Sequence, residues 1–176
     1  MIIQRPWWQS RIKLLMQHRP IVWLTGVRRV GKTVLCQSLE NVQYFDCELP
    51  SVRREMEDPE LFLKAHDGML LALDEIHRLE DPALLLKIAA DHFPRIRVIA
   101  TGSSTLGASS KFRDTLAGRK SELYLTPLCE ADSNFPQYND RTRRFLNGGL
   151  PSFYLADLRD ERDYSEWMEA FWARDI

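Results

Sequence analysis

Residues 26–33 read GVRRVGKT, and this stretch decides the fold of the chain because it matches the phosphate-binding pattern G-x-x-x-x-G-K-[ST]. The apolar residues 21–24, IVWL, predict a strand before it, and residues 33–39, TVLCQSL, predict a helix after it. Background residue frequencies give an accidental match a chance of about one in a hundred in such a chain. Strand, loop and helix in this order predict a phosphate-binding loop; the alternative is an ordinary glycine-bearing turn with an unrelated lysine.

The residue types of the loop suit a polyphosphate. Gly26 and Gly31 allow left-handed or crowded backbone, so that successive N–H groups can converge on an anion. The helix that follows favours negative charge at its N-terminus, Lys32 can reach the β and γ oxygens, and the Thr33 hydroxyl is placed to bind Mg²⁺. We expect the other loop residues to line the nucleotide as well: Val27, Arg28, Arg29, Val30 and Val34.

Composition bounds the class of protein. The chain has 176 residues, enough for one sizeable core, and a formal net charge of −1, which gives no overall attraction to nucleic acid or to an acidic membrane. Cys36, Cys47 and Cys129 are widely spaced and contain no C-x-x-C pair, which is typical of a reduced, cytoplasmic protein. No apolar run approaches the roughly 20 residues that span a bilayer, so we expect no membrane contact.

Strand and helix signals alternate along the chain. After an amphipathic helix over residues 7–17, strand signals recur and helical segments separate them. This alternation predicts an α/β fold in three layers, a parallel sheet between helices, with ligands at the carboxyl ends of the strands. The later strands are predicted at residues 42–47, 69–73, 97–100 and 122–125, and the helices at 51–64 with a break at Pro59, 82–88, 112–117 and 164–172.

Paired acids follow the third strand. Asp74 and Glu75 come directly after the apolar residues 69–73, MLLAL. Next to a magnesium nucleotide, Asp74 can hold the metal through its water, and Glu75 can orient and deprotonate the attacking water. The alternative is an acidic turn at an ordinary strand end. The phosphate loop in the same chain favours the catalytic interpretation.

The strand over residues 42–47 separates the loop strand from the acidic strand in the sequence. This order resembles the P-loop division in which a further strand inserts between those two strands. The fourth strand would be that insert, and its end, TGSS at residues 101–104, would bring hydroxyl groups close to the γ-phosphate and the attacking water. Ser103 is the first candidate for this sensing role and Thr101 the second, with a plain Gly/Ser turn as the alternative.

Four motifs in order carry a family resemblance: GVRRVGKT, LLALDEIHRL, VIATGSS and TLAGRKSELYLTPL. Together they resemble the AAA-type prokaryotic P-loop ATPases over about residues 20 to 130, although His77 stands where that family usually has glutamine. The resemblance implies ATP binding and hydrolysis on a five-stranded sheet of order 5-1-4-3-2. It also suggests that Arg119 senses nucleotide or reaches the γ-phosphate of a neighbouring subunit, which would require a homo-oligomer. A solvent-exposed or structurally paired arginine is the alternative.

The resemblance also suggests a domain division. We predict an N-terminal helix over residues 1–18, an ATPase core over 19–128 and a helical extension over 129–176. Similar proteins continue into a further C-terminal domain, so we expect a truncated or short member.

The sequence thus predicts a Mg²⁺-dependent nucleoside triphosphatase, preferably for ATP. One rival is a slow or non-hydrolysing nucleotide-gated switch or scaffold for a protein or nucleic-acid partner, and a small-molecule kinase of the same fold is another. A nucleic-acid partner stays open, because the basic residues at 28–29 and 141–144 could contact phosphates or simply form solvated or salt-bridged surface. The four histidines are scattered without ligand spacing, so no metal other than Mg²⁺ is expected.

Overall fold

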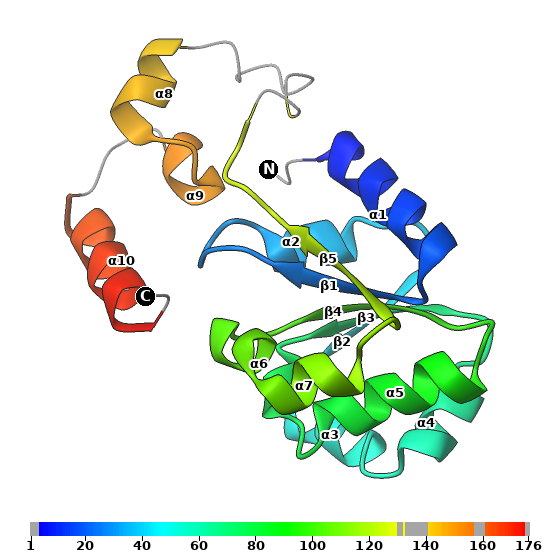
Figure 1. The fold of residues 1–176 in the computed structure, drawn as a ribbon. Helices are drawn as coiled ribbons and strands as arrows, with labels where there is room; N and C mark the ends of the chain where they lie inside the picture. The colour runs from blue at the N-terminus through cyan, green and yellow to red at the C-terminus, as the bar shows by residue number, and fades with distance from the viewer. Residues whose placement is uncertain (1–3, 130–131, 133–140, 157–160, 175–176) are drawn as a thin grey trace.

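The centre of the fold is a parallel sheet with the strand order β2-β3-β4-β1-β5 (Figure 1). This computed structural model describes residues 4–129, 132, 141–156 and 161–174. The expected three-layer α/β class and strand order are confirmed. Within the described residues, the five strands of the sheet are β1 Ile21–Thr25, β2 Val42–Asp46, β3 Leu70–Asp74, β4 Arg97–Thr101 and β5 Lys120–Tyr124.

Helices connect the strands and cover both faces of the sheet (Figure 1). Proline stands in the first turn of several of them, where its missing N–H costs nothing, and Asp58 and Asp81 cap two of them with side-chain oxygens. The helices are α1 Pro6–His18, α2 Lys32–Gln37, α3 Pro50–Glu55, α4 Pro59–Ala65, α5 Pro82–His92, α6 Ser104–Ala108, α7 Ser110–Thr115, α8 Arg141–Asn147, α9 Pro151–Tyr154 and α10 Glu161–Arg174, with a 3₁₀ turn η1 at Ile76–Arg78.

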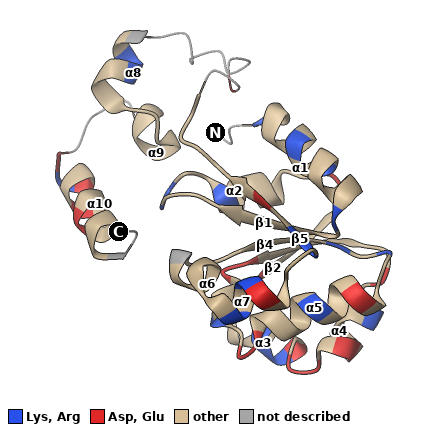
Figure 2. Ribbon diagram, in the orientation of Figure 1, with Lys and Arg blue, Asp and Glu red and all other residues tan. Residues whose placement is uncertain are grey.

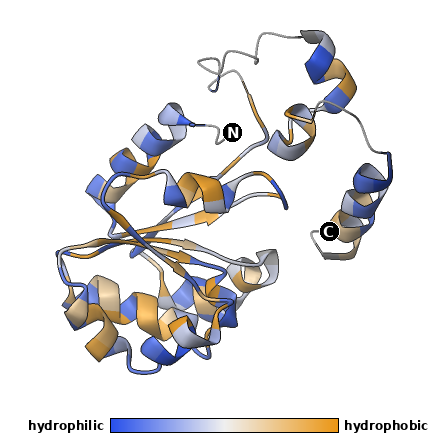
Figure 3. Ribbon diagram, turned by 180° about the vertical axis from the view of Figure 1, so that it is seen from behind, coloured by the Kyte–Doolittle hydropathy of each residue, from blue (hydrophilic) through white to orange (hydrophobic). Residues whose placement is uncertain are grey.

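Alternating strand residues build two cores, one on each side of the sheet. Ile21 and Trp23 pack with helices α4, α5 and α7, whereas Val22 and Leu24 pack with α1 and α2. Successive strand side chains point to opposite faces, so continuous apolar strands can be buried on both sides. Figure 3 shows the resulting apolar strands, and Figure 2 shows that charged residues gather mainly on the surrounding helices.

The predicted elements lie where the sequence pattern places them and differ from the prediction mainly at their ends, whereas helices α6, α8 and α9 were not predicted individually. Strand β3 begins at Leu70 and extends to Asp74, so that this carboxylate belongs to the sheet. Strand β5 begins two residues before the predicted start, at Lys120. Pro59 separates α3 from α4 as expected. No helix in the described part of the chain is both long and apolar enough to cross a bilayer.

Candidate functional site

The loop between β1 and α2 curls back on itself through residues with positive φ. Gly26 has φ 144°, Arg29 has φ 61° and Gly31 has φ 98°. A β-carbon added at Gly26 would lie 2.5 Å from the Leu125 carbonyl oxygen, so no other residue fits there without movement of the backbone. Positive φ beside ordinary negative φ, as around Arg29 and Gly31, is a backbone conformation that can turn neighbouring N–H groups toward an anion.

Lys32 begins helix α2 and folds back over this loop. Its Nζ donates to the carbonyl oxygens of Gly26 at 2.8 Å and Val27 at 3.3 Å. The ammonium group is therefore held at the mouth of the loop, where a polyphosphate chain would enter. The structure places the predicted phosphate-binding lysine and glycines in one small volume.

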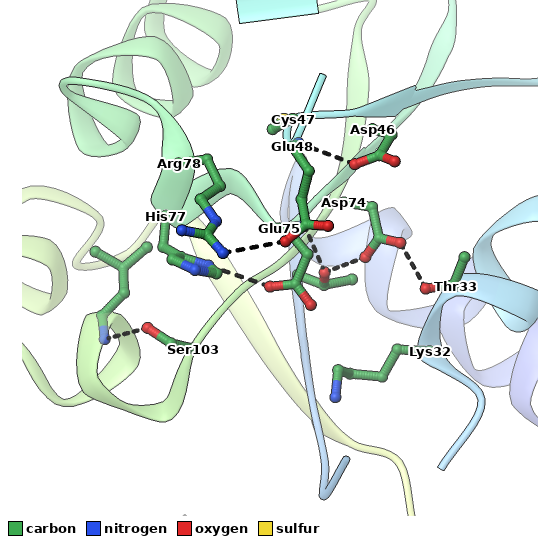
Figure 4. A network of polar contacts seen from close by, with 12 residues as sticks. Lys32, Thr33, Asp46, Cys47, Glu48, Asp74, Glu75, His77, Arg78 and Ser103 are labelled. Atoms are coloured by element: carbon green, nitrogen blue, oxygen red, sulfur yellow. Dashed lines mark hydrogen bonds and ion pairs between the residues drawn. The ribbon is translucent and has the colours of Figure 1, made fainter. Parts of the chain in front are cut away.

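Asp74 lies at the junction of β3, β4 and α2. Ala72 packs in the core beside α1 and α2, and Asp74, two residues later on the same strand face, points the same way. The Thr33 hydroxyl donates to Asp74 Oδ2 at 2.6 Å (Figure 4). The Thr101 hydroxyl donates to Oδ1 of the same carboxylate. The residue is only 3% exposed. A buried carboxylate beside a hydroxyl oxygen is a hard oxygen donor set of the kind that Mg²⁺ takes together with phosphate oxygens and water, so the residues fit the expected ion.

Tyr44 on β2 is a further member of the site, which the sequence reasoning did not identify. Its hydroxyl donates to Asp74 Oδ2 at 2.8 Å. The pKa of Tyr44 is raised well above its usual value, mainly by burial and secondly by the hydrogen bond to Asp74. The phenol therefore stays protonated as a donor. Tyr44 is paired with Ala72, and a long side chain reaches diagonally to a neighbour two residues on.

Glu75 follows Asp74 with a left-handed backbone at φ 54°. Its N–H donates to the Thr101 hydroxyl at 3.0 Å, and its Oε2 lies 3.1 Å from His77 Nδ1. The reversed backbone hand directs Glu75 away from Asp74 and into the open space in front of Lys32 (Figure 4). A non-glycine residue in this conformation is strained and is held there by its surroundings.

The two hydroxyl groups predicted at the end of β4, those of Thr101 and Ser103, make different contacts. Thr101 contacts both acids, donating to Asp74 and accepting from the Glu75 N–H. Ser103 lines the cavity, but its Oγ accepts from Leu106 N at 3.3 Å and so caps helix α6. The sensing role of Ser103 stays a prediction, and Thr101 is the hydroxyl that the fold places on the acids.

Lys32, Glu75 and Ser103 line a cavity of about 780 Å³. Helix α10 closes one side of it, because Phe171 and Ala173 line the cavity and the Trp167 indole N–H donates to the Arg28 carbonyl oxygen at 3.2 Å. The sequence predicts an aromatic helix here but not its contact with the phosphate loop. The polar cavity lining from the loop and the strand ends includes Arg28, Lys32, Glu48, Glu75, His77, Arg78 and Ser103.

Arg119 lies at the amino ends of the strands, whereas the phosphate loop lies at their carboxyl ends. It immediately precedes β5, whose first residue Lys120 is in register with Ile21 at the beginning of β1, whereas the loop follows the end of β1. Its guanidinium donates to both carboxylate oxygens of Asp91, at 2.7 and 2.9 Å. These hydrogen bonds hold the pKa of Asp91 below its usual value. Within one chain Arg119 is therefore a structurally paired arginine, and only a role toward a neighbouring chain stays open.

A buried ion pair joins the N-terminal segment to the far side of the loop. Arg5 Nε and Nη2 donate to the two carboxylate oxygens of Asp132, each at 2.8 Å, with side chains 4% and 1% exposed. The same guanidinium contacts the carbonyl oxygens of Thr126 at 3.0 Å and Val30 at 3.4 Å. Arg5 thus connects helix α1, the segment after β5 and the phosphate loop, and no motif in the sequence marked it.

Arg143 accounts for part of the second basic cluster. Its Nε donates to the Tyr154 carbonyl oxygen at 2.7 Å, and Nη2 donates to those of Leu155 and Ala156. These bonds satisfy carbonyl groups at the end of helix α9. Arg143 therefore has a structural role in this part of the extension.

Phosphate loop, acidic strand end and strand order together define a P-loop nucleotide-binding protein. Residues 18–132, more than half of the chain, match the family of AAA domains. The chain therefore belongs to the AAA-type P-loop ATPase family, as the four sequence motifs predicted.

Relatives of known sequence are longer than this chain. The uncharacterized proteins Rv2008c of Mycobacterium tuberculosis and Mb2031c of Mycobacterium bovis are each 29% identical to it over 175 residues. The match covers 97% of this chain but only 38% of the length of each relative.

Solved structures share the fold. The Walker-type ATPase PABY2304 of Pyrococcus abyssi matches with a TM-score of 0.56 and 19% identity, over 97% of this chain and 63% of that one. A DNA replication initiation factor matches with a TM-score of 0.51 and 12% identity, over 94% of this chain and 58% of that one. At these identities the similarity establishes the fold alone.

Proposed function

We propose that this chain binds ATP with Mg²⁺ and hydrolyses it in the cavity in front of the phosphate loop. The observation that carries the proposal is the placement of Thr33 Oγ1 2.6 Å from Asp74, with Glu75 and Lys32 lining the same cavity. Those positions meet three requirements of phosphoryl transfer: a cradle for the phosphates, a metal site and a carboxylate in reach of the attacking water.

Each residue has a proposed role. Loop amides and Lys32 bind the phosphate chain, and Thr33 and Asp74 hold the ion. A bound Mg²⁺ supplies neutralising charge for the β and γ oxygens. Glu75 is the general base that orients water and accepts its proton, and Thr101 keeps both acids in place through its single hydroxyl.

Lys32→Ala tests the binding half of the proposal. We expect the dissociation constant for magnesium ATP to rise by about ten- to a hundredfold, because a charge-assisted hydrogen bond to phosphate is lost. Calorimetry with the wild-type chain measures the reference value. Lys64→Ala, at an exposed position of α4, is the matched control and should bind normally. Failure of the folded wild-type chain to take up any triphosphate would end the proposal.

Phosphate release from ATP by the wild-type chain tests hydrolysis. The same assay with nucleic acid added tests whether nucleic acid is a partner of the chain. The second candidate, a nucleotide-gated switch, has its own support in the Trp167 hydrogen bond to the Arg28 carbonyl, since a ligand in the loop would act directly on helix α10. Tight binding without phosphate release favours the switch. We also propose that the nucleotide is an adenine nucleotide. A cytoplasmic location is part of the same proposal and is in keeping with free Cys36, Cys47 and Cys129.

Arg119 provides a test of assembly. If it stabilises charge on a neighbour's γ-phosphate, Arg119→Ala lowers turnover while the affinity for ATP stays unchanged, and the wild-type rate per molecule rises with protein concentration. The measurement is phosphate release over a dilution series. Unchanged turnover in the variant would leave Arg119 with its structural pairing to Asp91 only.

A further inference from the structure

His77 faces the carboxylate of Glu75 at the wall of the cavity. His77 Nδ1 lies 3.1 Å from Glu75 Oε2, and both residues line the same cavity as Lys32 (Figure 4). Their side chains are 25% and 37% exposed, so both can meet a ligand without rearrangement of the fold.

The backbone holds both partners of this contact. Ile76, fully buried between them, anchors the turn in the core, and Arg78 N donates to the Glu75 carbonyl oxygen at 3.0 Å. The Glu75 N–H is bound to Thr101, so the carboxylate begins from a fixed backbone position. The one neighbouring cation on the turn, Arg78, pairs with Glu48 at 3.1 Å.

The contact has an ion-pair distance of 3.1 Å but lacks hydrogen-bond alignment, and Nδ1 is a buried nitrogen without a hydrogen-bond partner among the described residues. A carboxylate accepts only, so the ring nitrogen opposite it has to carry hydrogen. A rotation of the imidazole that aligned this N–H with Oε2 would leave the other oxygen of Glu75 for a ligand in the cavity. A general base works best when its orientation is set before the substrate arrives.

We propose that His77 is a positioning residue for Glu75: its Nδ1–H aligns with Oε2 when nucleotide is bound, so that Oε1 is directed at the attacking water. This inference rests on the proposed function. In the hydrolysis step that Glu75 assists, the water oxygen bonds to the γ-phosphorus while the bond from that phosphorus to the β–γ bridging oxygen breaks. ADP keeps that oxygen and the bonding electrons, and Glu75 takes the proton from water.

The test compares His77→Ala with His77→Gln. Alanine removes the donor, and we expect kcat to fall about ten- to a hundredfold while KM and the ATP dissociation constant stay within about threefold of wild type. Glutamine carries an N–H donor on a chain of similar reach, so kcat should return to within about threefold of wild type. His92→Ala, at an exposed helix end, is the matched histidine control.

The outcomes separate this inference from the proposed function. His77→Ala with a wild-type rate, or His77→Gln as slow as the alanine variant, overturns the positioning role. Adding His77→Ala to Glu75→Gln should cause no further loss, because the two residues act as one unit. A Glu75→Gln variant that hydrolyses ATP normally refutes the base assignment itself. If the alanine variant does not fold, His77→Asn, whose shorter amide falls short of Glu75, takes its place in the comparison.

Discussion

Glu75→Gln should bind magnesium ATP with nearly unchanged affinity and lose about a hundred- to ten-thousandfold in turnover, the range that a general base contributes. Glutamine has the shape of glutamate but cannot accept the proton of the attacking water. The loop amides, Lys32 and the Thr33–Asp74 pair remain intact, so the phosphates still have their ligands. Single-turnover phosphate release and calorimetry measure the two quantities separately.

Glu48→Gln is the matched control for this variant. Glu48 lines the same cavity, but its carboxylate pairs with Arg78 at 3.1 Å and its side chain is 56% exposed. We expect this control to retain turnover, because loss of charge in the cavity alone does not remove the base. Equal losses in both variants would show that the cavity field, and not proton transfer, governs the rate.

Arg5→Ala should lower the free energy of unfolding by about 3–5 kcal/mol, the usual consequence of removing one partner of a buried ion pair. Asp132 would be left 1% exposed without its cation, although it would still accept from the Cys129 N–H at 2.9 Å. The carbonyl oxygens of Val30 and Thr126 would lose a donor as well. Urea unfolding followed by tryptophan fluorescence measures the change.

Two variants make this prediction specific. Lys13→Ala, on helix α1, breaks an exposed pair with Glu40, with side chains 62% and 80% exposed, and should cost no more than about 1 kcal/mol. The double change Arg5→Met with Asp132→Leu should recover most of the stability, because neither charge is then buried alone. An Arg5→Ala variant as stable as the Lys13 control would contradict the assignment.

The local sequence pattern was sufficient to locate the phosphate loop and the acidic pair Asp74 and Glu75. Gly26, Gly31, Lys32 and Thr33 carry their chemistry at fixed spacing, and a parallel sheet brings all strand ends to one edge. The sequence therefore predicts Asp74 near Thr33, and the two are hydrogen-bonded. The strand order came from the family resemblance, because spacing alone does not say which strands are neighbours.

The selection among hydroxyl groups depended on register. Leu73 pairs with Ala100, which puts Asp74 beside Thr101 and leaves Ser103 beyond the strand as a helix cap. Tyr44 reaches Asp74 because it lies in register with Ala72 on the same face. Sequence reasoning ranks Ser103 first and passes over Tyr44, because the register between strands decides which side chains reach Asp74 and no local pattern states that register.

By itself, the sequence determined a phosphate-binding loop with a carboxylate pair on an α/β sheet, since those features depend on residue types a few positions apart and on the period of apolar residues. Only the tertiary structure decided that Arg119 lies at the edge away from the loop, that Trp167 touches the loop, and that Arg5 is buried against Asp132. Each of these contacts joins segments distant in the chain. Packing of whole helices and strands sets such distances, and no short stretch of residues encodes them.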